Sequence, residues 1–268
     1  MPAYNAEKYI GEAIESILSQ TFRDFEFIII DDDSGDRTFE IIQEYAKKDG
    51  RVVAIKNDKN LRISRTLNKG LNLAKGKYIA RMDADDWSYP DRFQKQFDFM
   101  EANPEVGISG GTMEVCDKKL VRIKKSYRKY NLTDKEIRKK IFRYSPFCHP
   151  LVMFRAEVLK KYNFYYGPAL AIAEDYDLYF KIGMVSKFGN LEDILAKYRI
   201  VDDGTSVSKS RIQERLTLYI RIKAVFEYGY RMSFNDKLYF LGQFLSMFMI
   251  PQKFKIDLFN FFRNDTDV

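Results

Sequence analysis

Residues 25–38 read FEFIIIDDDSGDRT, an apolar run that leads directly into three consecutive aspartates. The run is short, rich in isoleucine and phenylalanine, and bounded by charges, as expected for a buried strand of a parallel sheet. A second stretch repeats this arrangement, because KYIARM (77–82) precedes Asp83, Asp85 and Asp86. The sequence therefore places two acidic clusters directly after two predicted strands.

Helical and strand-like patterns alternate over the first hundred residues. This alternation predicts βαβ units and a parallel sheet, in which ligands bind beyond the carboxyl ends of the strands. The predicted strands are 25–30, 51–56 and 77–82, and the predicted helices follow the N-cap candidate Asn5, span about 37–48 and 63–76, and begin near Pro90.

The alternation loosens after residue 104. We expect strands at 107–115 and 151–155, a basic helix at 133–143, a helix beginning near 173, and helices with many aromatics from 207 onward. The chain is therefore divided into a mononucleotide-binding α/β half (1–104), a mixed half of the same domain (105–206) and a helical C-terminal appendage (207–268).

Composition points to a folded protein of a reducing compartment. Of 268 residues, 46% are hydrophobic and 15% aromatic, enough for a sizeable core. Two cysteines are too few for a disulfide framework or a thiolate zinc site, so a cytoplasmic setting is expected. No signal-peptide pattern precedes the first helix, and the apolar stretch 239–250 is too short to span a bilayer.

Charge is shared unevenly between the two parts of the chain. The net charge is −3 over residues 1–104 and +10 over residues 105–268, which gives +7 in total. The basic part could meet anionic lipid, a phosphorylated acceptor or simply solvent. No recognisable motif would place these charges on a groove of nucleic acid, so we expect no nucleic-acid partner.

The two acidic clusters predict a site for a hard divalent cation. Strand ends of a doubly wound sheet can bring the clusters together, and crowded carboxylates are unfavourable unless a cation lies among them. Mg²⁺ or Mn²⁺ prefers such oxygens and is usually shared with the phosphates of a substrate. The alternative is that each cluster is a polar turn whose acids complement the following helix dipole.

Four motifs together resemble the family 2 glycosyltransferases, inverting enzymes of the GT-A fold. They are PAYN (2–5), IIDDDSGDRT (29–38), ARMDADD (80–86) and AEDYDL (173–178), in that order. The resemblance covers roughly residues 1–200. It implies a Rossmann-like, mixed but mostly parallel sheet flanked by helices, and it makes 105–206 the acceptor-binding half.

The resemblance also implies a donor-binding site. Pro2, Ala3 and Tyr4 match the segment that lies against the nucleotide base, and Asp32 matches the acid that hydrogen-bonds the uracil imide. An arginine at position 62, where the family often has glycine, could reach the base or a phosphate.

The remaining roles implied by the resemblance concern the cation and the reaction. Asp83-Ala84-Asp85 matches the family's Asp-x-Asp motif, with Asp83 toward the ribose and sugar and Asp85 on the cation that bridges the diphosphate. Asp175 matches the general base, although acids in a first helical turn are also common for dipole reasons. His149, the only histidine, is either structural or an acceptor-side contact.

Two departures from the family pattern carry structural expectations. Asp33 stands where the family usually has glycine. Family members also carry an apolar strand before the PAYN segment, and we expect this strand to be missing here. Because that strand is central in the expected sheet, its loss would leave unpaired backbone groups in the core.

The leading hypothesis is a metal-dependent inverting glycosyltransferase that transfers a sugar from a nucleotide donor, UDP in the first instance, to a glycan or lipid-linked acceptor in cell-surface polysaccharide synthesis. A peripheral contact with the inner membrane face would suit its basic half and aromatic helices. One alternative is a sugar-1-phosphate nucleotidyltransferase, which would need a glycine-rich basic loop where PAYNAEKY (2–9) stands. Another is a truncated, non-catalytic relative that binds a nucleotide.

Overall fold

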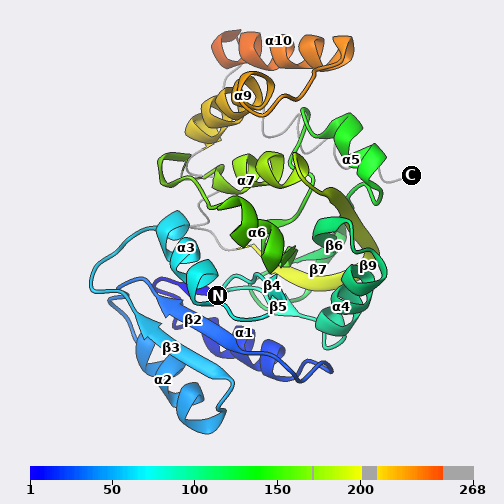
Figure 1. The fold of residues 1–268 in the computed structure, drawn as a ribbon. Helices are drawn as coiled ribbons and strands as arrows, with labels where there is room; N and C mark the ends of the chain where they lie inside the picture. The colour runs from blue at the N-terminus through cyan, green and yellow to red at the C-terminus, as the bar shows by residue number, and fades with distance from the viewer. Residues whose placement is uncertain (171, 201–209, 250–268) are drawn as a thin grey trace.

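The computed structural model describes residues 1–170, 172–200 and 210–249, and its strands form two sheets (Figure 1). In the first sheet β2 (Phe27–Asp31) lies between β1 (Pro2–Ala3) and β3 (Val52–Lys56), and all pairs are parallel. The strands predicted at 25–30 and 51–56 are thus confirmed as β2 and β3.

The second sheet is mixed. Its order is β4 (Tyr78–Ala80), β8 (Met153–Arg155), β6 (Val106–Cys116), β9 (Lys187–Arg199) and β5 (Trp87–Ser88), with β7 (Arg122–Arg128) also paired to β6. The long β6–β9 ladder is parallel, whereas the other pairs are antiparallel. The strand predicted at 151–155 begins only at Met153, because a 3₁₀ turn covers His149–Leu151.

Helices lie against both sheets and form a cap at one end (Figure 1). The predicted helices are present with shorter bounds, and the basic helix α5 is capped by Thr133 and Glu136 as a capping box. The helices are α1 (Ile10–Leu18), α2 (Thr38–Lys48), α3 (Ile63–Leu73), α4 (Arg92–Ala102), α5 (Asp134–Lys140), α6 (Ala156–Tyr162), α7 (Glu174–Gly183), α9 (Ser210–Phe226) and α10 (Phe234–Met249), with a 3₁₀ turn at Pro168–Leu170.

The expectation that Asn5 caps the first helix is wrong. Asn5 has φ +49°, and its side-chain oxygen accepts a hydrogen bond from Gly35 N at 2.9 Å. Its backbone N donates to Ser34 Oγ at 2.9 Å, so the residue ties the PAYN segment to the loop after β2. Helix α1 begins only at Ile10, after Tyr9.

The PAYN segment contributes the short strand β1 through its first two residues, Pro2 and Ala3. β1 pairs with the end of β2, Ile30 N donates to Met1 O at 2.9 Å, and the α-amino group of Met1 donates to Ile28 O at 2.8 Å. In the described part of the chain, no strand continues this pairing along the first half of β2 or joins β2 to β4. The described strands therefore form two separate sheets, one containing β2 and the other containing β4.

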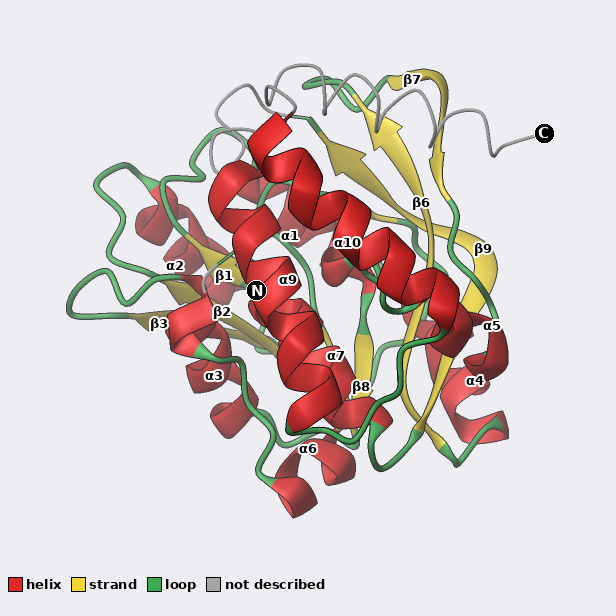
Figure 2. Cartoon of the chain, turned by 90° about the horizontal axis from the view of Figure 1, so that it is seen from above, coloured by secondary structure: helices red, strands yellow, loops and turns green. Residues whose placement is uncertain are grey.

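The C-terminal helices pack on the rest of the domain. Figure 2 shows α9 and α10 lying over α7, and Asp177 of α7 anchors α9 by accepting hydrogen bonds from Lys223 at 3.1 Å and from Tyr228 at 2.8 Å. Arg143 also forms an ion pair of 3.0 Å with Asp236 of α10. The proposed boundary at residues 206 and 207 lies outside the described residues.

Candidate functional site

The PAYN segment and Asp32 lie side by side at the carboxyl end of the first sheet. Asp32 N donates to Ala3 O at 2.8 Å, which places the exposed ring of Tyr4 next to the loop after β2. The buried Asp32 carboxylate is held through Oδ1, which accepts from Asn57 Nδ2 at 2.7 Å, Thr66 Oγ1 at 2.8 Å and Leu61 N at 2.9 Å. These bonds fix one oxygen and leave Oδ2 for a ligand.

Asp83, Asp85 and Asp86 form the second acidic group, directly after β4. One carboxylate oxygen from each lies within 4.8 Å of the others, a spacing that suits a shared cation. The group is joined to the first sheet by packing, because Ala3 belongs to the same apolar cluster as Met82 and Ala84. The segment after β1 and the loop after β4 thus share an apolar cluster, while the group of acids that could hold a cation, as found among the described residues, includes no side chain of the Asp31–Asp33 cluster.

Arg199 at the end of β9 shapes this acidic loop from behind. Its backbone N donates to Asp86 Oδ1 at 3.0 Å and its Nε donates to Asp85 O at 2.8 Å, while its guanidinium pairs with Glu12 at 2.6 Å. Asp86 Oδ2 is buried and has no hydrogen-bond partner among the described residues. An orphaned carboxylate oxygen beside two other acids is the arrangement that a hard cation would complete.

The protonation of the acidic group reflects this crowding. Burial and the charge of Asp83 raise the pKa of Asp85 to about 6, and burial, Asp83 and Asp85 raise the pKa of Asp86 well above its usual range. Like charges in a poorly solvated site disfavour ionisation of one another. A divalent cation would reverse this effect and hold the carboxylates ionised.

Arg81 is the basic partner of the site, and sequence reasoning did not assign it a role. Its side chain is only 8% exposed, and its Nη1 donates to Asp83 Oδ2 at 2.6 Å. Its charge also lowers the pKa of both Glu174 and Asp175, which burial otherwise raises. One guanidinium thus faces the acidic group and the start of α7 together. The sequence signal that could have identified Arg81 was its position within the ARMDADD motif (80–86), directly before the acidic group.

Asp175 lies in the first turn of α7 on the same side of the domain. Burial, followed by the charge of Glu174, raises the pKa of Asp175 to about 7. Glu174 itself accepts a hydrogen bond from Ile172 N at 2.7 Å, which fixes the turn that presents its neighbour. A carboxylate with this pKa can be ionised and still take up a proton near neutral pH.

His149 faces the same region through Tyr166, a residue that sequence reasoning missed. The His149 Nε2 and Tyr166 Oη atoms lie 2.9 Å apart. Burial and the charge of Arg81 lower the pKa of His149 well below its usual range, so the ring is neutral at physiological pH. The contact with Tyr166 supports a structural role for His149. A contact between His149 and the acceptor stays a prediction.

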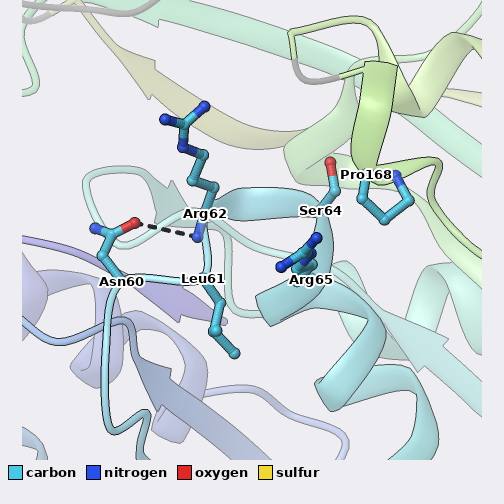
Figure 3. Close-up of a pocket in the computed structure, with 6 residues that line it drawn as sticks. All are labelled: Asn60, Leu61, Arg62, Ser64, Arg65 and Pro168. Atoms are coloured by element: carbon cyan, nitrogen blue, oxygen red, sulfur yellow. Dashed lines mark hydrogen bonds between the residues drawn. The ribbon is translucent and has the colours of Figure 1, made fainter.

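Asp33 and Arg62, both beside the site, have positive φ angles. Asp33 has φ +63°, which explains why glycine would suit that position. Arg62, directly before α3, has φ +67° and ψ +163°, a combination adopted almost only by glycine. Arg62 borders a cavity of about 280 Å³, shown in Figure 3, whose other lining residues are Asn60, Leu61, Ser64, Arg65 and Pro168.

The comparison with protein families decides the assignment. The model of the protein family described as "Glycosyl transferase family 2" matches residues 1–162 of the chain. The chain belongs to the family 2 glycosyltransferases. An uncharacterized glycosyltransferase of Methanocaldococcus jannaschii is 38% identical over 222 residues, covering 82% of this chain and 76% of the relative. The O-antigen biosynthesis glycosyltransferase WbnJ of Escherichia coli is 33% identical over 215 residues, covering 78% and 81%.

Solved structures confirm the predicted fold class. The S. aureus protein TarS, residues 1–349 in complex with UDP, superposes with a TM-score of 0.67 at 20% identity, covering 94% of this chain and 71% of that one. The mannosyltransferase PcManGT of Pyrobaculum calidifontis, with GDP-Man and Mn²⁺, gives a TM-score of 0.65 at 16% identity, covering 92% and 68%. The fold is thus of the GT-A type, and the chain is a glycosyltransferase.

The conformation of Arg62 leads to a stability prediction. We expect Arg62→Gly to raise the free energy of unfolding by about 1 kcal/mol, because glycine relieves a backbone strain of roughly 1–3 kcal/mol and loses part of that gain as chain entropy. Arg65→Gly is the matched control, since Arg65 is equally exposed but lies inside α3, where glycine costs about 1 kcal/mol. Urea unfolding would measure both; a loss of stability in both variants would contradict the assignment of strain.

Proposed function

We propose that the chain is a metal-dependent inverting glycosyltransferase that takes a sugar from a nucleotide donor, with UDP as its nucleotide. The observation that carries the proposal is the juxtaposition of the Asp83, Asp85 and Asp86 carboxylates with Asp175 around the Arg81 guanidinium. TarS with UDP and PcManGT with GDP-Man and Mn²⁺ show that proteins of this fold bind such donors, which supports the assignment by analogy.

The donor would bind across the carboxyl ends of the two sheets. Pro2, Ala3 and Tyr4 would lie against the base, Asp32 would accept the imide N–H through Oδ2, and Arg62 would reach the base or a phosphate. The fixed Oδ1 orients the Asp32 carboxylate before the nucleotide arrives, which lowers the cost of binding.

Asp85 would hold the cation, with Asp83 toward the ribose and sugar and Ala84 keeping the two carboxylates apart. A bound Mg²⁺ or Mn²⁺ would neutralise the charge that develops on the leaving diphosphate. The chain fits this group because the acids crowd together, the pKa of Asp85 is raised to about 6 and one Asp86 oxygen is buried without a partner.

Asp175 would act as the general base. Its carboxylate would accept the proton of an acceptor hydroxyl while that oxygen attacks the anomeric carbon and the bond to the diphosphate breaks. A single displacement inverts the anomeric configuration and requires no enzyme nucleophile. Arg81, which faces both Asp83 and Asp175, would keep the base ionised in its buried position.

We further propose that the acceptor is a glycan or lipid-linked glycan of cell-surface polysaccharide synthesis. WbnJ, a relative that matches over most of both chains, is named for O-antigen biosynthesis. The nucleotidyltransferase alternative is disfavoured by the family assignment.

Peripheral contact with the inner membrane face, by a cytoplasmic protein, is part of the same proposal. None of the described helices is both long and apolar enough to cross a bilayer. Helix α10 instead exposes apolar side chains at the spacing of a single helical face, while Asp236 and Gln243 on its other side contact the protein. The residues of this face are Phe234, Leu238, Leu241, Leu245 and Phe248, and α10 also exposes Tyr239, Phe244 and Met249.

Donor binding is tested by calorimetry with UDP, with and without Mn²⁺. We expect metal-dependent binding by the natural chain and at least about tenfold weaker binding by Asp85→Asn, because the amide cannot supply a charged ligand to the cation. Asp98→Asn, on the exposed side of α4, is the control and should bind as the natural chain does. Equal, metal-independent binding by all three proteins would contradict the proposed cation site.

The pH dependence of kcat/KM tests the general base. Because Asp175 must be ionised and its pKa is about 7, kcat/KM should fall about tenfold per pH unit below pH 7 and level off above it. Glu174→Gln should move this acid limb to lower pH, since the charge of Glu174 raises the pKa of Asp175. Asp175→Asn should lose roughly 10²–10⁴-fold in rate. An acid limb unchanged in Glu174→Gln would argue against Asp175.

Flotation with lipid vesicles tests the membrane contact. The natural chain should float with vesicles containing anionic phosphatidylglycerol, because exposed Arg231 and Lys237 accompany the apolar face. The double variant Leu241→Glu and Leu245→Glu should remain in the dense fraction, since charge disfavours burial of that face. Asn235→Glu, exposed on the same helix, is the control. Failure of the natural chain to float would remove the membrane from the proposal.

A further inference from the structure

Arg221 of α9 carries a buried guanidinium group that no carboxylate accompanies. The residue is only 1% exposed. The acids of the neighbouring helices are paired elsewhere, Asp177 with Lys223 at 3.1 Å and Asp236 with Arg143 at 3.0 Å, and no acid among the described residues forms an ion pair with Arg221. Because burial of an unpaired charge is costly, the neutral groups around it must offset that cost.

Three neutral acceptors from three parts of the chain hold this guanidinium. Its Nε donates to Tyr176 Oη of α7 at 3.2 Å, its Nη1 to Gln243 Oε1 of α10 at 2.5 Å, and its Nη2 to the carbonyl of Arg143 at 2.8 Å. Its central carbon also lies 5.9 Å from the ring centre of Tyr176 and 5.5 Å from that of Tyr239 on α10. One side chain of α9 thus joins α7 to α10, which Figure 2 shows lying close together.

Tyr176 directly follows Asp175, the proposed general base, in the first turn of α7. Tyr176 is 3% exposed, and its Oη donates to the carbonyl of Ile141 while it accepts the bond from Arg221. The hydroxyl is therefore held from two sides, by α9 and by the residue that follows α5. Because both side chains project from one turn, any rotation of α7 about its axis would displace them together. Fixing Tyr176 therefore fixes the direction of Asp175.

Other contacts hold the later part of α7. Asp177 accepts hydrogen bonds from Lys223 and Tyr228, and Tyr230 Oη donates to the carbonyl of Phe180 at 3.0 Å. These contacts do not involve Arg221, so they would remain in a variant that lacks its guanidinium. Such a variant would keep α7 attached and lose the bond nearest the proposed base.

We propose that Arg221 is a positioning residue, which holds the first turn of α7, and with it Asp175, and is itself held by Gln243 of α10. This inference rests on the proposed role of Asp175. Packing alone would not require a charge, because apolar side chains of similar volume often replace buried charged groups without loss of stability. A guanidinium instead donates to several acceptors in fixed directions, which an apolar side chain cannot do.

The same contacts make α10 part of the support for the site. Gln243 bonds Arg221 directly, and Asp236 pairs with the side chain of Arg143, whose carbonyl is another acceptor for Arg221. Loss of the Gln243 side chain should therefore loosen Arg221. A helix that lies outside the donor site would in this way influence the rate of the reaction.

The kinetic test is the release of UDP from UDP-glucose, UDP-galactose or UDP-N-acetylglucosamine, with Mn²⁺ present and water as the acceptor, on the donor that the natural chain hydrolyses fastest. Arg221→Met should lower kcat at least about tenfold, because a displacement of about 1 Å can cost roughly 10²-fold in rate. The KM for the donor and the affinity for UDP with Mn²⁺ should change less than about twofold, since other elements form the donor site. Arg221→Lys, which keeps the charge, should recover part of kcat. Arg215→Met, exposed on the same helix, is the matched control.

Hydrogen exchange of the segment 174–183 measures the hold on α7 without any substrate. Arg221→Met and Gln243→Ala should each speed exchange in this segment at least about threefold, whereas Arg215→Met should leave it unchanged. Tyr176→Phe removes only the hydroxyl group. It should lower kcat and speed exchange in the same direction, and it carries the test if Arg221→Met does not fold.

Two outcomes would overturn the inference. In one, Arg221→Met and Tyr176→Phe keep the kcat and the α7 exchange of the natural chain. In the other, both variants lose UDP affinity and Tm together with kcat, which would mean that Arg221 only stabilises the fold. An active Asp175→Asn variant, or no release of UDP by the natural chain, would instead contradict the proposed function. Hydrogen exchange would then still decide whether Arg221 holds the first turn of α7, and unchanged exchange would overturn that hold.

Discussion

The ion pair between Arg81 and Asp83 is the interaction on which the rest of the site depends. Five acidic side chains gather near this guanidinium, and burial without a counter-charge would cost several kcal/mol for each ion. The backbone fixes its position, because Arg81 N donates to Val152 O and its carbonyl accepts from Arg92 Nη2 at 2.7 Å. The second sheet thereby holds Arg81, the positive charge that offsets the acidic side chains of the site.

The two sheets contribute different parts of the proposed chemistry. The first supplies a preoriented Asp32 and the Tyr4 segment, while the second supplies the acidic loop, which Arg199 supports through Asp85 O and Asp86. Helix α7 adds Asp175 from its first turn, and its remaining length is anchored to α9 through Asp177 and Lys223. The surrounding elements thus present crowded carboxylates, among them the buried and unpartnered Oδ2 of Asp86.

Much of this arrangement could be predicted from the sequence, for identifiable reasons. β2 is buried and therefore reads as a continuous apolar run, and the acids after it and after β4 mark strand ends. β9 was missed because exposed and charged residues interrupt its apolar ones, although it builds the longest ladder. Arg81 was missed because partners distant in sequence determine its role. The parallel pairing of Pro2 and Ala3 with the end of β2 required coordinates, because a two-residue strand has no periodic pattern in the sequence.

The most direct test of the central claim is a crystal structure of the chain with UDP and Mn²⁺, with the metal located by its anomalous signal. The account predicts Mn²⁺ at about 2.2 Å from an Asp85 carboxylate oxygen and in contact with the diphosphate, with the uracil against Pro2–Tyr4 and Asp32. Mn²⁺ bound away from the Asp83–Asp86 loop, or UDP bound elsewhere on the protein, would contradict it.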